Sequence, residues 1–149
     1  MSGGEISALQ LPRALADRIV EQARRERPAE CCGIIAGTAG RPVEVFPIPN
    51  VEQADPNRRY LMDEKAHLQT LTAIDERAWD LLAYYHSHPA TGAYFSDTDV
   101  ARAWPGLYVV VGMEHPEAPV LKAFRVGDGK RAGEIDRDLV SDVPVHIVD

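Results

Sequence analysis

The sequence lacks the features of a secreted, membrane-spanning or nucleic-acid-binding protein. No hydrophobic run is long enough to cross a membrane, and Met1 to Gln10 does not show the charged-then-apolar layout of a signal peptide. Its 16 Lys and Arg are outnumbered by 23 Asp and Glu, and the net charge of −7 argues against a nucleic-acid or polybasic membrane-surface protein. We therefore expect a cytoplasmic protein with neither nucleic acid nor membrane as a partner.

Cysteine is scarce as well. The two cysteines, Cys31 and Cys32, are adjacent, and neighbouring cysteines rarely satisfy disulfide geometry with each other. With no third thiol there is no disulfide framework, so we expect both to be small buried hydrophobes. A chain of 149 residues can bury one core without cross-links, which predicts a single domain over 1–149, with 1–9 as a short flexible start.

Hydrophobic spacing predicts an α/β or α+β domain in which helices lie on a mixed sheet. We expect one helix over 12–27, a second over 64–77 with Leu68, Leu71 and Ile74 facing inward, and a third that begins at Ser96. The expected strands cover 31–37, 43–48, 60–62, 79–88, 107–113, 120–126, 131–135 and 143–148. The run 79–88 is the strongest candidate for a central strand.

A pair of histidines ends that central run, at His86 and His88. Residues i and i+2 of a strand point to the same face, so the two imidazoles would form half of a zinc site. Pro89 ends the strand, and the ten residues between His88 and Asp99 can return a carboxylate to the strand end. Two neutral histidines, one aspartate and Zn²⁺ carry a net charge of +1 and leave a fourth position for water. A catalytic zinc lowers the pKa of such a water toward roughly 7.

The same residues have plainer explanations. A His-x-His pair is common by chance, Ser96 and Asp99 can serve only as a helix cap, and single histidines such as His67, His115 and His146 are ordinary. These residues also leave the general base unassigned. Some enzyme classes are nevertheless excluded: a barrel amidohydrolase needs about 250 residues, and the deaminase and His-Glu-x-x-His signatures are absent.

Taken together, three motifs resemble those of the JAMM (MPN+) metalloprotease family. They are Glu30-Cys31-Cys32-Gly33, His86-Ser87-His88-Pro89 and Ser96-Asp97-Thr98-Asp99, and the likeness runs from about Leu11 to Lys130. It implies a cytidine-deaminase-like fold with a sheet sandwiched by helices. It further implies that His86, His88 and Asp99 bind zinc, that Glu30 moves the proton of the attacking water, and that Ser96 stabilises the oxyanion. One departure is Phe95, where relatives often carry proline.

Within that family the chain resembles the compact prokaryotic hydrolases of ubiquitin-like sulfur-carrier proteins, including those of cysteine biosynthesis. The resemblance implies cleavage of the amide bond after a carrier's C-terminal Gly-Gly, for example with release of cysteine. We expect the segment Arg58 to Met62 to offer a strand edge to the carrier's tail, with Arg58 or Arg59 meeting acidic groups of the carrier. The carrier, the released residue and the oligomeric state stay open, a homodimer being one alternative. Two other functions also stay open: a non-catalytic module that binds ubiquitin-like proteins, and a zinc hydrolase of a small-molecule amide in siderophore or cofactor assembly.

Overall fold

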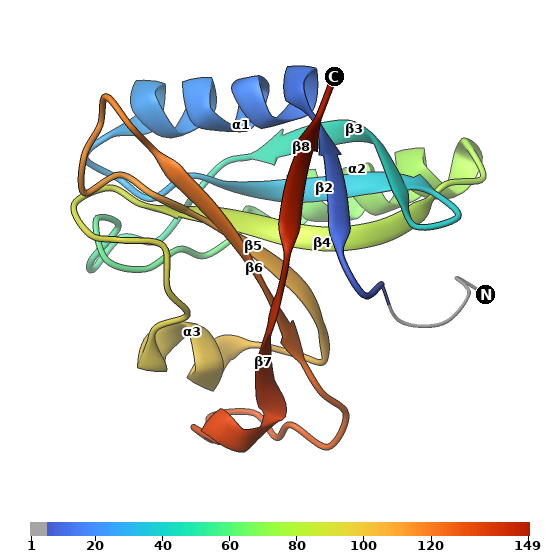
Figure 1. The fold of residues 1–149 in the computed structure, drawn as a ribbon. Coiled ribbons are helices and arrows are strands. Elements are labelled where there is room, and N and C mark those ends of the chain that lie inside the picture. The colour runs from blue at the N-terminus through green and yellow to red at the C-terminus, as the bar shows by residue number, and fades with distance from the viewer. Residues whose placement is uncertain (1–5) are drawn as a thin grey trace.

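Six strands form a mixed sheet in this computed structural model, which describes residues 6–149 (Figure 1). All neighbouring strands are antiparallel except the central pair β4–β5. The spatial order is β3 (Arg41–Ile48), β2 (Cys32–Thr38), β4 (Asp80–His88), β5 (Gly106–Gly112), β6 (Val120–Val126) and β7 (Val140–Val143). The expected α+β architecture with a mixed sheet is confirmed, and the run containing the two histidines is indeed a central strand.

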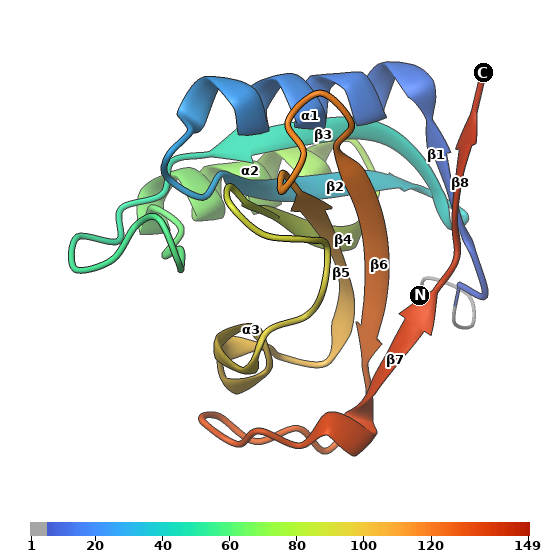
Figure 2. The same cartoon turned by 60° about the vertical axis from the view of Figure 1, so that its left-hand side comes forward.

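Three α-helices cover the two faces of this sheet. The first, α1 (Arg13–Glu26), lies on one face, and α2 (Glu64–Glu76) and α3 (Asp97–Arg102) lie on the other. Figure 2 shows α1 and α3 on opposite sides of the twisted sheet. Because side chains alternate along a strand, odd positions of β4 such as Tyr85 pack beneath α1. Even positions, including His86 and His88, face the side of α2 and α3.

A second, two-stranded parallel sheet joins the ends of the described chain. It pairs β1 (Leu9–Pro12) with β8 (Val145–Val148), and Leu9 and Leu11 are fully buried in the core beneath α1. Leu9 had been expected in the flexible start but begins β1, while residues 1–5 of that start lie outside the described residues. The expected last strand over 143–148 is divided at Pro144 between β7 and β8.

Some local predictions are wrong. The segment 131–135 is not a strand: it follows a turn with positive φ at Gly129 and itself contains a second at Gly133. Strand β6 pairs instead with β7, which follows the short 3₁₀ helix η1 (Arg137–Leu139). The strand over 60–62 is reduced to one bridge between Met62 and Asn50.

The predicted inward face of α2 is also partly wrong. Ile74 is buried as expected, but Leu68 and Leu71 are 65% and 36% exposed. The face of α2 that meets the sheet carries Ala66, which packs on the core, and His67, which bonds to Tyr84. The two leucines lie beside that face.

Among the described residues, no helix is both long and apolar enough to cross a membrane.

Gly112, the last residue of β5, allows the loop after β4 to cross the sheet end. A Cβ at this position would lie 2.2 Å from the backbone N of Ala93, which is closer than real Cβ contacts come. The same loop leads directly to Ser96 and α3. The missing side chain therefore lets the chain bring Asp99 back to the two histidines.

We predict that Gly112→Ala displaces this loop. Overpacking of this kind costs about 1–3 kcal/mol of the free energy of unfolding, and the shift should also weaken the binding of a metal ion by the expected ligands. Urea unfolding and zinc titration measure the two effects. Gly92→Ala is the matched control in the same loop, because its Cβ would meet only Glu114 Oε2 at 3.8 Å. Equal behaviour of the two variants would contradict this role for Gly112.

Candidate metal centre

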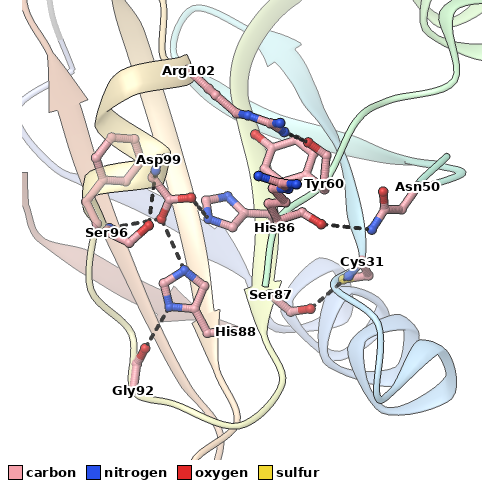
Figure 3. A network of polar contacts seen from close by, with 12 residues as sticks. Cys31, Asn50, Tyr60, His86, Ser87, His88, Gly92, Ser96, Asp99 and Arg102 are labelled. Atoms are coloured by element: carbon pink, nitrogen blue, oxygen red, sulfur yellow. Dashed lines mark hydrogen bonds and ion pairs between the residues drawn. The ribbon is translucent and has the colours of Figure 1, made fainter. Parts of the chain in front are cut away.

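Three residues expected to bind metal converge at the end of β4. The ligating atoms of His86, His88 and Asp99 all lie within 4.8 Å of one another, and all three side chains are buried (Figure 3). Nε2 of His86 is 3.0 Å from Oδ1 of Asp99, and Nε2 of His88 is 3.1 Å from its Oδ2. The i, i+2 spacing on β4 sets the two imidazoles on one face, and α3 delivers the carboxylate.

The second nitrogen of His88 indicates what this arrangement requires. Nδ1 lies 3.0 Å from the carbonyl oxygen of Gly92, which can only accept a hydrogen bond, so in neutral His88 the proton is on Nδ1 and Nε2 is a lone pair. That lone pair faces a carboxylate oxygen. Two acceptors at this distance need a proton or a cation between them. A backbone carbonyl that orients a histidine in this way is a common second contact of metal ligands.

His86 has a related imbalance. Nδ1 of His86 is buried and has no hydrogen-bond partner among residues 6–149, and within the same residues Nε2 contacts only Oδ1 of Asp99. The ring is held by aromatic neighbours, stacking on Tyr60 with centroids 4.8 Å apart. Two imidazoles and one carboxylate are the donor set of a catalytic zinc that retains an open position. The residues therefore fit this metal.

Asp99 serves both the helix and the ligand group. Ser96 and Asp99 form a capping box: the Ser96 amide donates to Oδ2 of Asp99 and the Asp99 amide donates to Oγ of Ser96, both at 3.0 Å. Burial raises the pKa of Asp99, but the charges and hydrogen bonds of His86 and His88 outweigh it and hold that pKa well below its usual range. The carboxylate is thus ionised and fixed in orientation.

Glu30 lies opposite His88. The Ser87 amide donates to the carbonyl of Cys31 at 3.1 Å, and one further antiparallel step brings Glu30 beside His88 on the same face. Glu30 is 2% exposed, and its Oε1 has no hydrogen-bond partner in the described part of the chain. Burial and then the charge of Asp99 raise the pKa of Glu30 to about 9, which Arg102 partly offsets. A cation among the ligands would lower this pKa again.

Two polar residues that the sequence did not single out hold Glu30 in place. Oγ of Ser87 accepts the amide of Cys31 at 2.9 Å, and Nδ2 of Asn50 donates to the carbonyl of Glu30 at 3.0 Å. The alternation of β4 predicts that the side chain of Ser87 points away from the metal face, but it does not reveal the hydrogen bond from Cys31 beside Glu30. No comparable signal marked Asn50, which reads as an ordinary turn residue.

The hydroxyl of Ser96 acts as an acceptor in this structure. Its Oγ accepts from Asp99, and no acceptor for its O–H lies among the residues that the structure describes. Phe95 does not disturb this geometry. Its ring is buried, and its centroid lies 5.3 Å from that of Tyr108 and 5.6 Å from that of Phe124. These contacts anchor the loop on the hydrophobic core.

The segment 58–62 is held by its own bonds more than expected. The Leu61 amide donates to Asn50 Oδ1, the Tyr60 carbonyl accepts from Arg102, and Arg59 pairs with Glu52 at 3.1 Å. The backbone N–H of Tyr60 has no partner within residues 6–149. Of the strand edge expected over 58–62, the backbone N–H of Tyr60 is therefore the group left to pair with another strand. Arg58, the other arginine expected to meet the carrier, has no such bond and lies in the wall of a different hollow, described next.

Two hollows meet at the metal-ligand group. The first, of about 450 Å³, is mostly aromatic and apolar; the ligands His86 and Asp99 lie in its wall with Arg59, Tyr60, Leu61, Met62, His67, Tyr84, Phe95, Thr98, Arg102, Ala103, Trp104, Pro105 and Tyr108. The second has a volume of about 560 Å³, and its wall comprises Arg27, Pro28, Glu30, Asn57, Arg58, His88, Pro89, Ala90, Thr91, Tyr94, Ser96 and Thr98.

The other histidines and the cysteines stay outside the ligand group. His67 bonds to the hydroxyl of Tyr84 in the wall of the first hollow, and His115 is exposed beside Glu114. Both cysteines are buried and free, and burial raises the pKa of Cys31 to about 12. Their expected role as small hydrophobes is confirmed.

Comparison with known families gives one match that spans most of the chain. Residues 12–127 match the family described as prokaryotic homologs of the JAB domain. The chain is 32% identical over 150 residues to the CysO-cysteine peptidase of Mycobacterium tuberculosis, covering 98% of this chain and 95% of the relative. It is 39% identical over 124 residues to the probable TtuB-protein conjugate cleaving protease of Thermus thermophilus, covering 82% and 78%. Against the desampylase of Haloferax volcanii it is 35% identical over 112 residues, covering 70% and 80%.

Solved structures give the same fold. Protein DSY2949 from Desulfitobacterium hafniense matches with a TM-score of 0.78 at 25% identity, covering 94% of this chain and 92% of that one. AF2198 from Archaeoglobus fulgidus, a JAB1/MPN domain protein, matches with a TM-score of 0.59 at 17% identity, covering 96% and 100%.

Asp99→Asn should reduce zinc affinity by more than the roughly 10- to 100-fold that loss of an outer partner gives, because it removes the carboxylate charge. The amide keeps the size of the side chain and an acceptor oxygen for the cap. Asp97→Asn is the matched control on the same helix, since Asp97 is exposed and pairs with Arg137. Competition titration with a zinc chelator measures both. Equal zinc affinity in the two variants would contradict the ligand assignment.

Glu30→Gln should change how the stability of the metal-free protein depends on pH. The folded state keeps the Glu30 proton up to about pH 9, whereas the unfolded state releases it near 4.5. Between these values the folded state binds more protons, so the stability of the wild type falls as pH rises. At pH 7.5 the variant should be more stable by about 1–4 kcal/mol. Urea unfolding in EDTA from pH 5 to 8 tests this, and parallel curves for the two proteins would refute it.

Proposed function

The chain belongs to the JAB/MPN family, as one of the prokaryotic homologs of the JAB domain, and from this premise we propose that it is a zinc-dependent peptidase or isopeptidase. Its substrate is the amide bond that follows the C-terminal Gly-Gly of a small ubiquitin-like sulfur-carrier protein. The named relatives are peptidases or conjugate-cleaving proteases, which supports a hydrolase. The observation that carries the proposal is the convergence of three metal-ligand side chains beside a buried glutamate.

Zinc is the metal that this donor set suits best. His86, His88 and Asp99 would hold it. Nε2 of both histidines converges on the carboxylate of Asp99, and the acceptor nitrogen of neutral His88 faces a carboxylate oxygen, which supports a cation at this position. When bound, zinc supplies a Lewis acid that polarises the scissile carbonyl and makes water more acidic.

Glu30 is the general base of the proposed reaction. It takes a proton from the attacking water and returns it to the nitrogen of the leaving amine, which is the usual task of a positioned carboxylate in amide hydrolysis. Its burial and the two backbone bonds from Ser87 and Asn50 keep it aimed at the face of the histidines. Ser96 donates its free hydroxyl proton to the oxyanion, a contribution typically worth about 2.7–4 kcal/mol of barrier.

The carrier's tail enters along the first hollow. Glycine residues have no Cβ and can pass close to the aromatic wall, and the free N–H of Tyr60 can donate one hydrogen bond to a backbone carbonyl of the tail. Tyr60 also stacks on His86, so this pairing would place the tail directly beside a ligand. Release of cysteine is the specific reaction that we propose on the basis of the relative from Mycobacterium tuberculosis.

Glu30→Gln separates this proposal from a non-catalytic binding module. The variant should lose roughly 10²- to 10⁴-fold in turnover while still binding one zinc, because the base is lost and the ligands remain. The measurement is intact-mass spectrometry of a sulfur carrier ending in Gly-Gly-Cys, incubated with zinc-loaded protein. Undiminished turnover would contradict the role of Glu30. Cleavage of small amides but of no carrier would favour a small-molecule hydrolase instead.

A further inference from the structure

The two hollows differ in which part of an amide substrate they can hold. Glu30 lies in the wall of the second hollow and not of the first, and so does Ser96. The group that returns a proton to the leaving nitrogen must lie beside that nitrogen. On the proposed function, the leaving amine and whatever is attached to it therefore occupy the second hollow, and the acyl tail occupies the first.

Two arginines stand in the wall of the second hollow with their charges uncompensated. Neither the Arg27 nor the Arg58 guanidinium has a hydrogen-bond or ion-pair partner in the described range 6–149. Glu30 is the one acidic residue of that wall, and it is buried. The cations of the first hollow differ, because Arg59 and Arg102 both pair with Glu52.

We propose that Arg27 and Arg58 bind the α-carboxylate of the residue that leaves. The preferred substrate is then a carrier extended beyond Gly-Gly by a single amino acid whose carboxylate is free. An isopeptide conjugate is a poorer substrate, because its leaving lysine sits inside a protein chain and has no free α-carboxylate. The inference rests on the proposed hydrolysis and specifies its substrate class.

Guanidinium groups suit this task. Each presents a planar set of N–H donors that matches the two oxygens of a carboxylate, and the charge persists at any physiological pH. The reaction itself is ordinary hydrolysis: hydroxide from water bonds to the carbonyl carbon, the C–N bond breaks, and the proton taken by Glu30 goes to the amine. The products are a carrier ending in a Gly-Gly carboxylate and one free amino acid.

The test uses two substrates that differ in one group. A sulfur carrier ending in Gly-Gly-Cys with a free carboxylate is compared with the same carrier ending in Gly-Gly-Cys carboxamide, using zinc-loaded wild type, Arg27→Ala, Arg58→Ala and the double variant. A charge-assisted contact predicts that wild type prefers the free acid by roughly 10- to 100-fold in kcat/KM. The variants should lose most of this preference, through a fall on the acid that is far larger than the fall on the carboxamide.

Arg25→Ala is the matched control, because Arg25 lies on α1 and its one ion-pair partner among residues 6–149 is the exposed Glu21. It should keep the wild-type preference. Arg27 and Arg58 are exposed, and zinc content and urea unfolding check that their variants remain folded.

Two results would overturn the inference while leaving the proposed function intact. One is equal cleavage of acid and carboxamide by the wild type. The other is an equal fall on both substrates in the arginine variants, which would mean that the arginines contact the carrier itself. Failure of the wild type to cleave either substrate would instead reject the proposed function.

Discussion

A buried cluster of two imidazoles and two carboxylates is stable only when its charges and lone pairs are compensated, and the structure of this protein is arranged around that requirement. Asp99 is ionised within the cluster, Glu30 retains its proton to high pH without a metal, and the nitrogen of neutral His88 that faces Asp99 is an acceptor. A divalent cation relieves all three conditions together. The cluster therefore favours metal over the empty state for reasons of electrostatics, apart from any catalytic use.

The rest of the fold supplies the rigidity that such a cluster needs. The central position of β4 keeps both histidines in a hydrogen-bonded ladder, and the pairing of Ser87 with Cys31 fixes the register that places Glu30 opposite. On the other side, Arg102 joins α3 to the segment that carries Tyr60. The helix that provides Asp99 and the wall of the first hollow are thus mechanically linked.

The candidate site was largely predictable from the sequence, since it depends on local rules. The i, i+2 rule placed His86 and His88 together, and the capping box located the start of α3. The errors lie where tertiary context decides. Leu68 and Leu71 have the spacing of a buried helix face, yet α2 packs on the sheet along a stripe that includes Ile74 and leaves these two leucines exposed. The glycines near 131–135 form turns, and β7 is the strand that pairs with β6. Gly112 and Asn50 matter through contacts made far along the chain, which no local pattern reveals.

Asp99 both caps α3 and faces the two histidines, and this predicts the order in which Glu30 and Asp99 would be replaced if the site lost its function. Glu30 caps no helix, and burial makes its charged form unfavourable. Its replacement should therefore raise the free energy of unfolding of the metal-free protein. Asp99 caps α3 through the same oxygen that faces His88, so its replacement weakens a helix as well as a ligand group. In a descendant that becomes a non-catalytic scaffold, we therefore expect Glu30 to be replaced before Asp99.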